Sequence, residues 1–206
     1  MEKKQTIKSK LISQFGKPDG FLGRVAGTIM AYRPSNRLRN NWTVDLLDIK
    51  PDDRVLEIGF GPGLALQRVS QIITTGYVAG VDHSDAMLVM ATKRNSRAIG
   101  QGKVELFNAS GESLPEFGKP FDKVYMANVM MFWKDPVSSL KKIRDGLTTV
   151  GTIAITHMPR HGGATDEDAL NSGKDIVSKL EAAGFSGVKL EKLATKPMTV
   201  CAVATK

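Results

Sequence analysis

The amino-acid sequence predicts an α/β fold built on a mostly parallel sheet. Strand-like and helix-like segments alternate from residue 54 to about residue 184, which is the pattern of parallel strands joined by crossover helices. The chain then ends in two strand-like segments, 187–194 and 198–205, without a helix between them. These two segments are therefore expected to pair as an antiparallel hairpin at the end of the sheet.

Each expected element has a local signal. Ser84 suits the N-cap of a helix, Asp135 caps the next one with Pro136 in its first position, and Gly184 ends the last helix. Residues 158–173 read as a loop. Before the hairpin, the short apolar runs expected to be strands are 54–58, 76–82, 103–108, 121–131 and 151–157. The segments with helical spacing of apolar residues are 64–74, 84–99, 135–147 and 174–185.

The first 47 residues are predicted to be a helical arm, separate from a domain of residues 48–206. An apolar stripe in residues 21–30 is interrupted by Pro34, and a second helix is expected over residues 35–47. Of the net charge of +8, residues 1–40 carry +7. Such an arm could be a lid over a site, a helix on a membrane surface, or additional core. Its basic residues could contact an acidic substrate, anionic lipid or nucleic acid, or simply be solvated.

Composition sets further limits. The one cysteine, Cys201, cannot form an internal disulfide, which suits a reducing cytosol. The sequence lacks the apolar run of a signal peptide or a membrane span, so we predict a cytoplasmic location. Three scattered histidines and one cysteine have no metal-ligand spacing, so no metal site is expected.

The stretch "VLEIGFGPG" at residues 55–63 is the first functional signal. A strand leads into Glu57 and then into Gly59, Gly61 and Gly63, and the following helix would direct its positive end toward this loop. A dinucleotide fingerprint requires a glycine or alanine where this chain has leucine, and no G-K-[ST] of a Walker loop follows. A nucleoside cofactor or a simple tight turn therefore remains.

A second acid, Asp82, ends the next expected strand. A carboxylate in that position can accept hydrogen bonds from both hydroxyls of a ribose. Taken alone, Asp82 could also be only a helix cap. Two acids at neighbouring strand ends around a glycine loop suit a ligand with an ammonium group and a ribose but no phosphate.

The ordered motifs "VLEIGFGPG", "GVDHSDAM", "GESLP", "FDKVYMANVMMFWKDP" and "LEAAGF" resemble those of class I S-adenosylmethionine-dependent methyltransferases. The resemblance covers residues 44–206 and is to the branch that acts on small molecules and lipids. It implies a Rossmann-like three-layer sandwich with a seven-stranded sheet, and S-adenosylmethionine as cofactor. It also implies cofactor-binding residues around the expected strand ends.

The resemblance assigns these residues one by one. The three glycines would pass beneath the methionine part, Glu57 would lie near its ammonium, and Asp82 would hold the ribose hydroxyls. Asn128 would lie beside the sulfonium. Many relatives have an aspartate where this chain has a serine, so the adenine contacts depart from the usual pattern. The residues implied around the adenine are His83, Met87, Ser110, Gly111 and Glu112.

Methyl transfer from a sulfonium is an in-line displacement that depends mainly on alignment, and a general base is needed only when the nucleophile is protonated. The candidate bases are His157, His161 and Tyr125, although a strand-end histidine is more often hydrogen-bonded to backbone. The acceptor is expected to be a small molecule, with an acidic group if the arm's arginines contact it. These arginines are Arg24, Arg33, Arg37 and Arg39.

Three alternatives stay open. The protein could be a peripheral lipid methyltransferase that uses its arm on a membrane. It could be an adenosine-nucleotide or dinucleotide enzyme, or a non-catalytic protein that binds a nucleoside cofactor. Nucleic acid is a less suitable partner, because "ANVMMFW" stands where base-methylating enzymes have a proline-tyrosine signature, and no RNA-binding motif is present.

Overall fold

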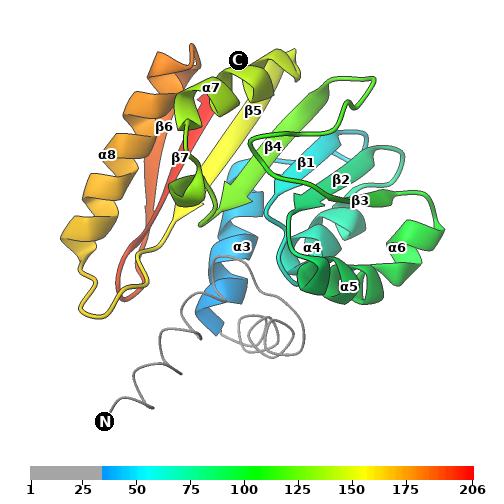
Figure 1. Ribbon diagram of the computed structural model, residues 1–206, viewed down its shortest axis with the longest axis horizontal. Helices are drawn as coiled ribbons and strands as arrows, with labels where there is room; N and C mark the ends of the chain where they lie inside the picture. Colours follow the sequence, from blue (N-terminus) through cyan, green and yellow to red (C-terminus); the bar gives the residue numbers. More distant parts are fainter. Residues whose placement is uncertain (1–33) are drawn as a thin grey trace.

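The computed structural model describes residues 34–206, which form a seven-stranded sheet flanked by helices (Figure 1). The strand order is β3-β2-β1-β4-β5-β7-β6. The first five strands are parallel, and β7 lies antiparallel between β5 and β6, which confirms the predicted fold class. The strands are β1 (Arg54–Ile58), β2 (Tyr77–Asp82), β3 (Val104–Asn108), β4 (Phe121–Ala127), β5 (Leu147–His157), β6 (Ser186–Leu193) and β7 (Thr199–Thr205).

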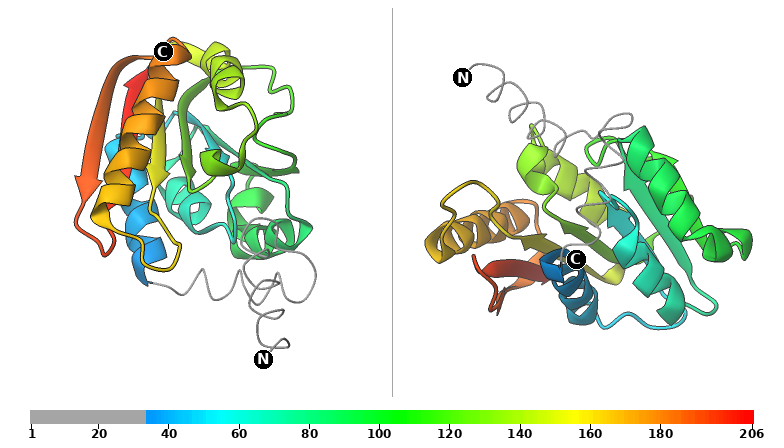
Figure 2. Two further views of the ribbon diagram at one scale, coloured as in Figure 1. Left: turned by 60° about the vertical axis from the view of Figure 1, so that its left-hand side comes forward. Right: turned by 90° about the horizontal axis from the view of Figure 1, so that it is seen from below.

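Helices cover both faces of the sheet, because alternate residues of each buried strand point to opposite sides. On one face Val55, Val78 and Tyr125 form a core with residues of the helices that precede β3. On the other face Leu56 and Val124 form a core with the two helices that precede β6. The helices are α3 (Pro34–Leu46), α4 (Leu64–Ile72), α5 (Asp85–Arg94), α6 (Ser96–Gly100), α7 (Pro136–Asp145) and α8 (Asp166–Ala182). Figure 2 shows α3 and α8 on opposite faces of the sheet.

Two predicted elements differ from the structure near the strand ends. The fourth strand was expected to reach residue 131, but it ends at Ala127 because Asn128 takes a positive φ of 57°. A short 3-10 helix, η1 (Met130–Phe132), follows instead. The helix expected over residues 84–99 divides at Asn95 into α5 and α6.

The segment predicted as a loop, residues 158–173, contains the first two turns of α8. The helix begins after Thr165, whose hydroxyl accepts a hydrogen bond from the N–H of Asp168, 3.2 Å away. The Asp168 carboxylate in turn accepts from the Thr165 N–H at 2.8 Å, which completes a capping box. Three acidic residues in the first turn also favour a helix start here.

The second half of the predicted arm packs on the sheet as α3. Val44 and Leu47 are buried in the same core as Val55, and the hydroxyls of Thr43 and Thr156 lie 2.6 Å apart, joining α3 to β5. The apolar stripe of residues 21–30 lies outside the described residues, so the lid, membrane and core interpretations of that segment stay predictions. Within residues 34–206, no helix has the length and apolar character that a membrane span requires.

Candidate cofactor site

The carboxyl ends of the parallel strands meet at one edge of the sheet, where ligands bind in folds of this kind. Ile58 at the end of β1 stands opposite Val81 of β2 and Met126 of β4. This register brings together the glycine loop after β1, Asp82 at the end of β2 and Asn128 after β4. The sequence separates Gly59 of the loop from Asn128 by 69 positions, and the sheet places them at one edge.

The three glycines of the loop differ in what surrounds them. All have positive φ, of 76° at Gly59, 50° at Gly61 and 75° at Gly63. A Cβ on Gly59 would lie 2.2 Å from the Cγ2 of Val129, and one on Gly63 would lie 2.6 Å from the Nδ2 of Asn95. A Cβ on Gly61 would meet no atom of residues 34–206 within 4 Å. Two glycines therefore permit protein packing, whereas Gly61 borders open space that a ligand can fill.

Asp82 holds this loop in place. One carboxylate oxygen accepts a hydrogen bond from the N–H of Gly61 at 2.8 Å, and the other accepts from the N–H of Ser84 at 2.9 Å. The side chain is buried, and this burial raises its pKa against the lowering effect of the backbone N–H donors and of His83. Ser84 caps α5 through its hydroxyl, as predicted, so Asp82 does not serve as that cap.

Glu57 is a buried acid with neutral hydrogen-bond partners, the Tyr125 hydroxyl and the backbone of Leu66. The hydroxyl of Tyr125 donates a hydrogen bond of 2.8 Å to its Oε2, since the two residues are direct neighbours in the β1–β4 register. Burial raises the pKa of Glu57 to about 8, and the nearby charge of Asp82 adds to this shift. Tyr125 itself is only 1% exposed. Tyr125 therefore orients Glu57 through this hydrogen bond. Because its hydroxyl is buried, Tyr125 has no accessible surface from which to act as the candidate base.

Two residues assigned to the adenine have different surroundings. His83 is half-exposed, with its Nδ1 3.9 Å from the Oδ1 of Asp82, so it lies at the rim of the site. Met87 lies in the core beneath α5 and is 1% exposed. It offers no surface to a ligand in this structure.

The loop at residues 110–112 is hydrogen-bonded to the segment after η1. The Glu112 carboxylate accepts hydrogen bonds from the N–H groups of Lys134, at 2.8 Å, and Asp135, at 3.2 Å. Ser110 accepts a hydrogen bond from the Glu112 N–H at 3.2 Å. A Cβ on Gly111 would lie 2.6 Å from Ile58 and 2.8 Å from the ring of Trp133, so this glycine is required by packing. Contact of these three residues with a ligand stays a prediction.

Asn128 joins the ends of β4 and β5. Its side-chain amide donates to the Met158 carbonyl at 3.1 Å, and its Oδ1 accepts from the Met158 N–H at 2.8 Å. Its own N–H donates to the carbonyl of Thr156 at 2.9 Å. Both ends of the amide are therefore occupied by backbone, and the positive φ of this residue turns the chain beside the glycine loop.

Of the two candidate histidines, only His157 lies at the site edge. It ends β5, is 8% exposed, and its pKa is lowered by burial and by the charges of Arg39 and Arg160. A lowered pKa keeps the imidazole neutral at pH 7, as a base must be. His161 is exposed, with its Nε2 3.7 Å from Asp168 at the start of α8.

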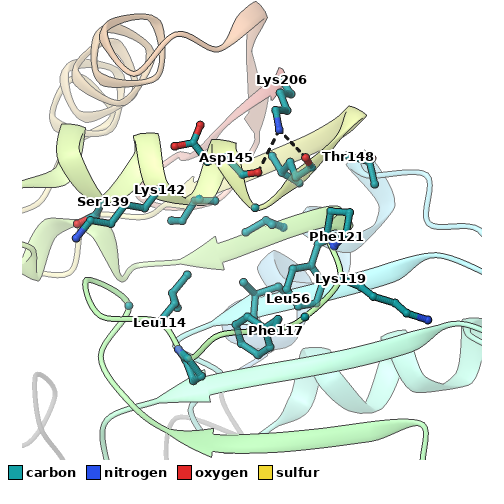
Figure 3. A pocket seen from close by; sticks show the side chains of 18 of the residues that line it. Leu56, Leu114, Phe117, Lys119, Phe121, Ser139, Lys142, Asp145, Thr148 and Lys206 are labelled. Carbon is teal, nitrogen blue, oxygen red and sulfur yellow. Dashed lines mark hydrogen bonds between the residues drawn. The ribbon is translucent and has the colours of Figure 1, made fainter.

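A cavity of about 850 Å³ lies away from the glycine loop. It opens between α7 and the connection from β3 to β4, which has no helix, and apolar side chains such as Leu114, Phe117 and Phe121 line it (Figure 3). The amino group of Lys206 closes one end by donating to the carbonyls of Asp145 and Leu147. Neither acid at the strand ends nor the glycine loop borders this cavity, so we do not assign it to the cofactor.

Comparison with known proteins agrees with this geometry. A family described as "Methyltransferase domain" matches residues 55–151, from β1 into β5. The chain is also 34% identical to the uncharacterized methyltransferase YdaC of Bacillus subtilis (strain 168) over 183 residues, which span 88% of this chain and 98% of that protein. The chain therefore belongs to the class I S-adenosylmethionine-dependent methyltransferases, as its motifs predict. The cofactor of this family is S-adenosylmethionine.

Solved structures share the fold at low sequence identity. A methyltransferase from Aquifex aeolicus, described as SAM-dependent, superposes with a TM-score of 0.67 at 20% identity, covering 87% of this chain and 97% of that chain. The cyclase SpnF superposes with a TM-score of 0.68 at 15% identity, covering 85% and 82%. One of these neighbours is named for a reaction other than methyl transfer, so the fold by itself does not determine the activity.

Proposed function

We propose that this protein transfers a methyl group from S-adenosylmethionine to a small-molecule acceptor. The observation that carries the proposal is the arrangement around Gly61, where open space borders a loop that Asp82 holds from below. Glu57 adds a second buried acid at the neighbouring strand end. This combination suits an uncharged ribose and an ammonium group better than a phosphate, which the charge of Asp82 would repel and which would oppose ionisation of Glu57.

The chain's own residues would act by binding and alignment. Asp82 has both oxygens on backbone N–H groups and keeps further lone pairs for ribose hydroxyls. Glu57, oriented by Tyr125, would bind the ammonium group, whose positive charge would lower the raised pKa of Glu57 and favour its ionised form. Bound S-adenosylmethionine supplies an electrophilic methyl group and a neutral leaving group, so no residue needs to stabilise a leaving anion. His157 would accept a proton where the acceptor is a hydroxyl or an ammonium.

Calorimetry with S-adenosylhomocysteine, the demethylated cofactor, tests the binding part. We expect one-to-one binding, and Asp82→Ala should weaken it by about 1.5–3 kcal/mol, or about 10- to 150-fold. The exposed Asp85, at the start of α5, provides a control with the same charge change, and Asp85→Ala should bind normally. The wild type showing no heat at millimolar ligand would refute the proposal.

A cycle of two changes separates ribose recognition from loop positioning. A 2′,3′-dideoxy analogue of S-adenosylhomocysteine should bind wild type more weakly than the parent compound, but should bind Asp82→Ala about as well as the parent does. Equal losses in both proteins would mean that Asp82 acts only on the loop.

Transfer itself requires an acceptor assay, because SpnF shows that the fold also carries another reaction. Radioactive methyl groups from the cofactor, incubated with protein and candidate small molecules, should appear in a product. Binding without transfer to any of them would favour the non-catalytic alternative. The lipid alternative depends on residues outside the described range, and liposome co-sedimentation of the full chain tests it. The cytoplasmic location stays a prediction.

A further inference from the structure

Arg39 is a buried charge whose guanidinium is only partly hydrogen-bonded. It lies on α3 and is 4% exposed. Its Nη2 donates to the Oδ1 of Asn36, whereas its Nε and Nη1 have no hydrogen-bond partner among the described residues. Buried arginines are normally paired with acids or fully hydrogen-bonded, because an unpaired charge loses its hydration without compensation. Two buried donors without an acceptor are therefore unusual in the interior of a native protein.

Among the described residues, Arg39 has a second arginine and a neutral amide beside it. Arg160, after β5, donates to the same Asn36 oxygen at 2.5 Å, so two guanidinium groups converge on one amide. Burial and the charge of Arg160 lower the pKa of Arg39 to about 9, and both arginines lower the pKa of His157. Within residues 34–206, no carboxylate forms a salt bridge with Arg39. Arg39 is therefore a buried positive charge that no acid of residues 34–206 neutralises through a salt bridge.

The cluster is fixed next to the proposed transfer site. The Thr43 hydroxyl donates to the Arg39 carbonyl at 2.9 Å and lies 2.6 Å from the Thr156 hydroxyl, which ties this turn of α3 to the end of β5. The carbonyl of Thr156 accepts the N–H of Asn128. Asn128 is the residue implied to lie beside the sulfonium. An anion bound to Arg39 would consequently lie on the side from which an acceptor approaches.

We propose that Arg39, with Arg160 and His157 beside it, binds an oxyanion of the methyl acceptor, either a carboxylate or a phosphate. This inference rests on the proposed function, since it treats the bound anion as part of the acceptor. The guanidinium donors would make charge-assisted hydrogen bonds to such a group. The acceptor would thus be an acidic small molecule, positioned by its anion so that its nucleophile points toward the methyl group.

Titration of the full chain with inorganic phosphate, and separately with acetate, tests the subsite without a known acceptor. Each titration is followed by melting temperature and by the ¹⁵N–¹H signal of the Arg39 Nε–H, with and without S-adenosylhomocysteine. We expect a saturable rise in melting temperature and a shift of this signal with at least one anion. Arg39→Gln should weaken that anion's binding at least about tenfold. The anion that binds more tightly indicates which oxyanion the acceptor carries.

Arg37 is the matched control, because it lies on the same helix but is exposed. Arg37→Gln should retain anion binding, and Arg39→Gln should retain binding of S-adenosylhomocysteine, which shows that it is folded. If Arg39→Gln does not fold, two measurements still test the subsite. The anion should shift the wild-type Nε–H signal, and Arg160→Gln should bind the anion more weakly than wild type.

The inference is overturned if neither anion shifts the Nε–H signal, or if Arg39→Gln and Arg37→Gln bind the anion equally. Failure of the proposed function has a different signature. In that case S-adenosylhomocysteine would not bind wild type, whereas the anion titration would still show binding at Arg39.

Discussion

Adding a methyl group to Gly61 should damage cofactor binding far more than it damages the fold. A Cβ at this position meets no atom of the described residues within 4 Å, so the folding cost of Gly61→Ala within residues 34–206 comes from the positive φ of 50°. That conformation costs a non-glycine residue about 1–2 kcal/mol, which for a chain of this size corresponds to a drop of about 2–8 °C in melting temperature. The methyl group would occupy space above the loop that we assign to the cofactor.

Gly102 provides the matched control for this experiment. It also has positive φ, 70°, and a Cβ there would likewise meet no atom of the described part of the chain within 4 Å, but it lies in the exposed turn before β3. Gly61→Ala and Gly102→Ala should therefore lose similar stability. Calorimetry should show S-adenosylhomocysteine binding at least about tenfold weaker in Gly61→Ala and unchanged in Gly102→Ala. Equal affinities in the two variants would refute the assignment of the glycine loop to the cofactor site.

Three further predictions concern a buried acid, a helix cap and the N-terminal segment. Because burial raises the pKa of Glu57 from 4.5 to about 8, the native chain retains a proton that the unfolded chain releases between these pH values. The contribution of Glu57 to stability should therefore fall as pH rises through that window. Urea unfolding at pH 5 and pH 8 should show a smaller fall in unfolding free energy for Glu57→Gln than for wild type. An equal fall in both proteins would contradict the prediction. Thr165→Ala removes one half of the α8 capping box and should lower the melting temperature by about 2–4 °C, with S-adenosylhomocysteine binding unchanged. A chain without residues 1–33 should still bind S-adenosylhomocysteine but lose methyl transfer if that segment is a lid, and full turnover of the truncated chain would exclude the lid.

Local sequence patterns were enough to predict most of the fold. The alternation of apolar strands with amphipathic helices, and the absence of a helix between the last two strands, predicted the parallel sheet with its antiparallel end. Prediction was weaker where a single residue changes the backbone direction. Asn128 ends β4 through a positive φ that its sequence neighbours do not indicate, and the Thr165–Asp168 pair starts α8 inside a segment rich in loop-forming residues.

The chemical character of the cofactor edge was likewise readable from the sequence, because the glycine spacing and the two strand-end acids are local features. The sequence by itself therefore determined the family and the strand-end residues implied to bind its cofactor. Only the tertiary structure distinguished Gly61, which borders open space, from Gly59 and Gly63, which accommodate Val129 and Asn95. It alone placed Arg39 beside Arg160 and His157, since more than a hundred residues separate Arg39 from them and the packing of α3 on β5 brings them together.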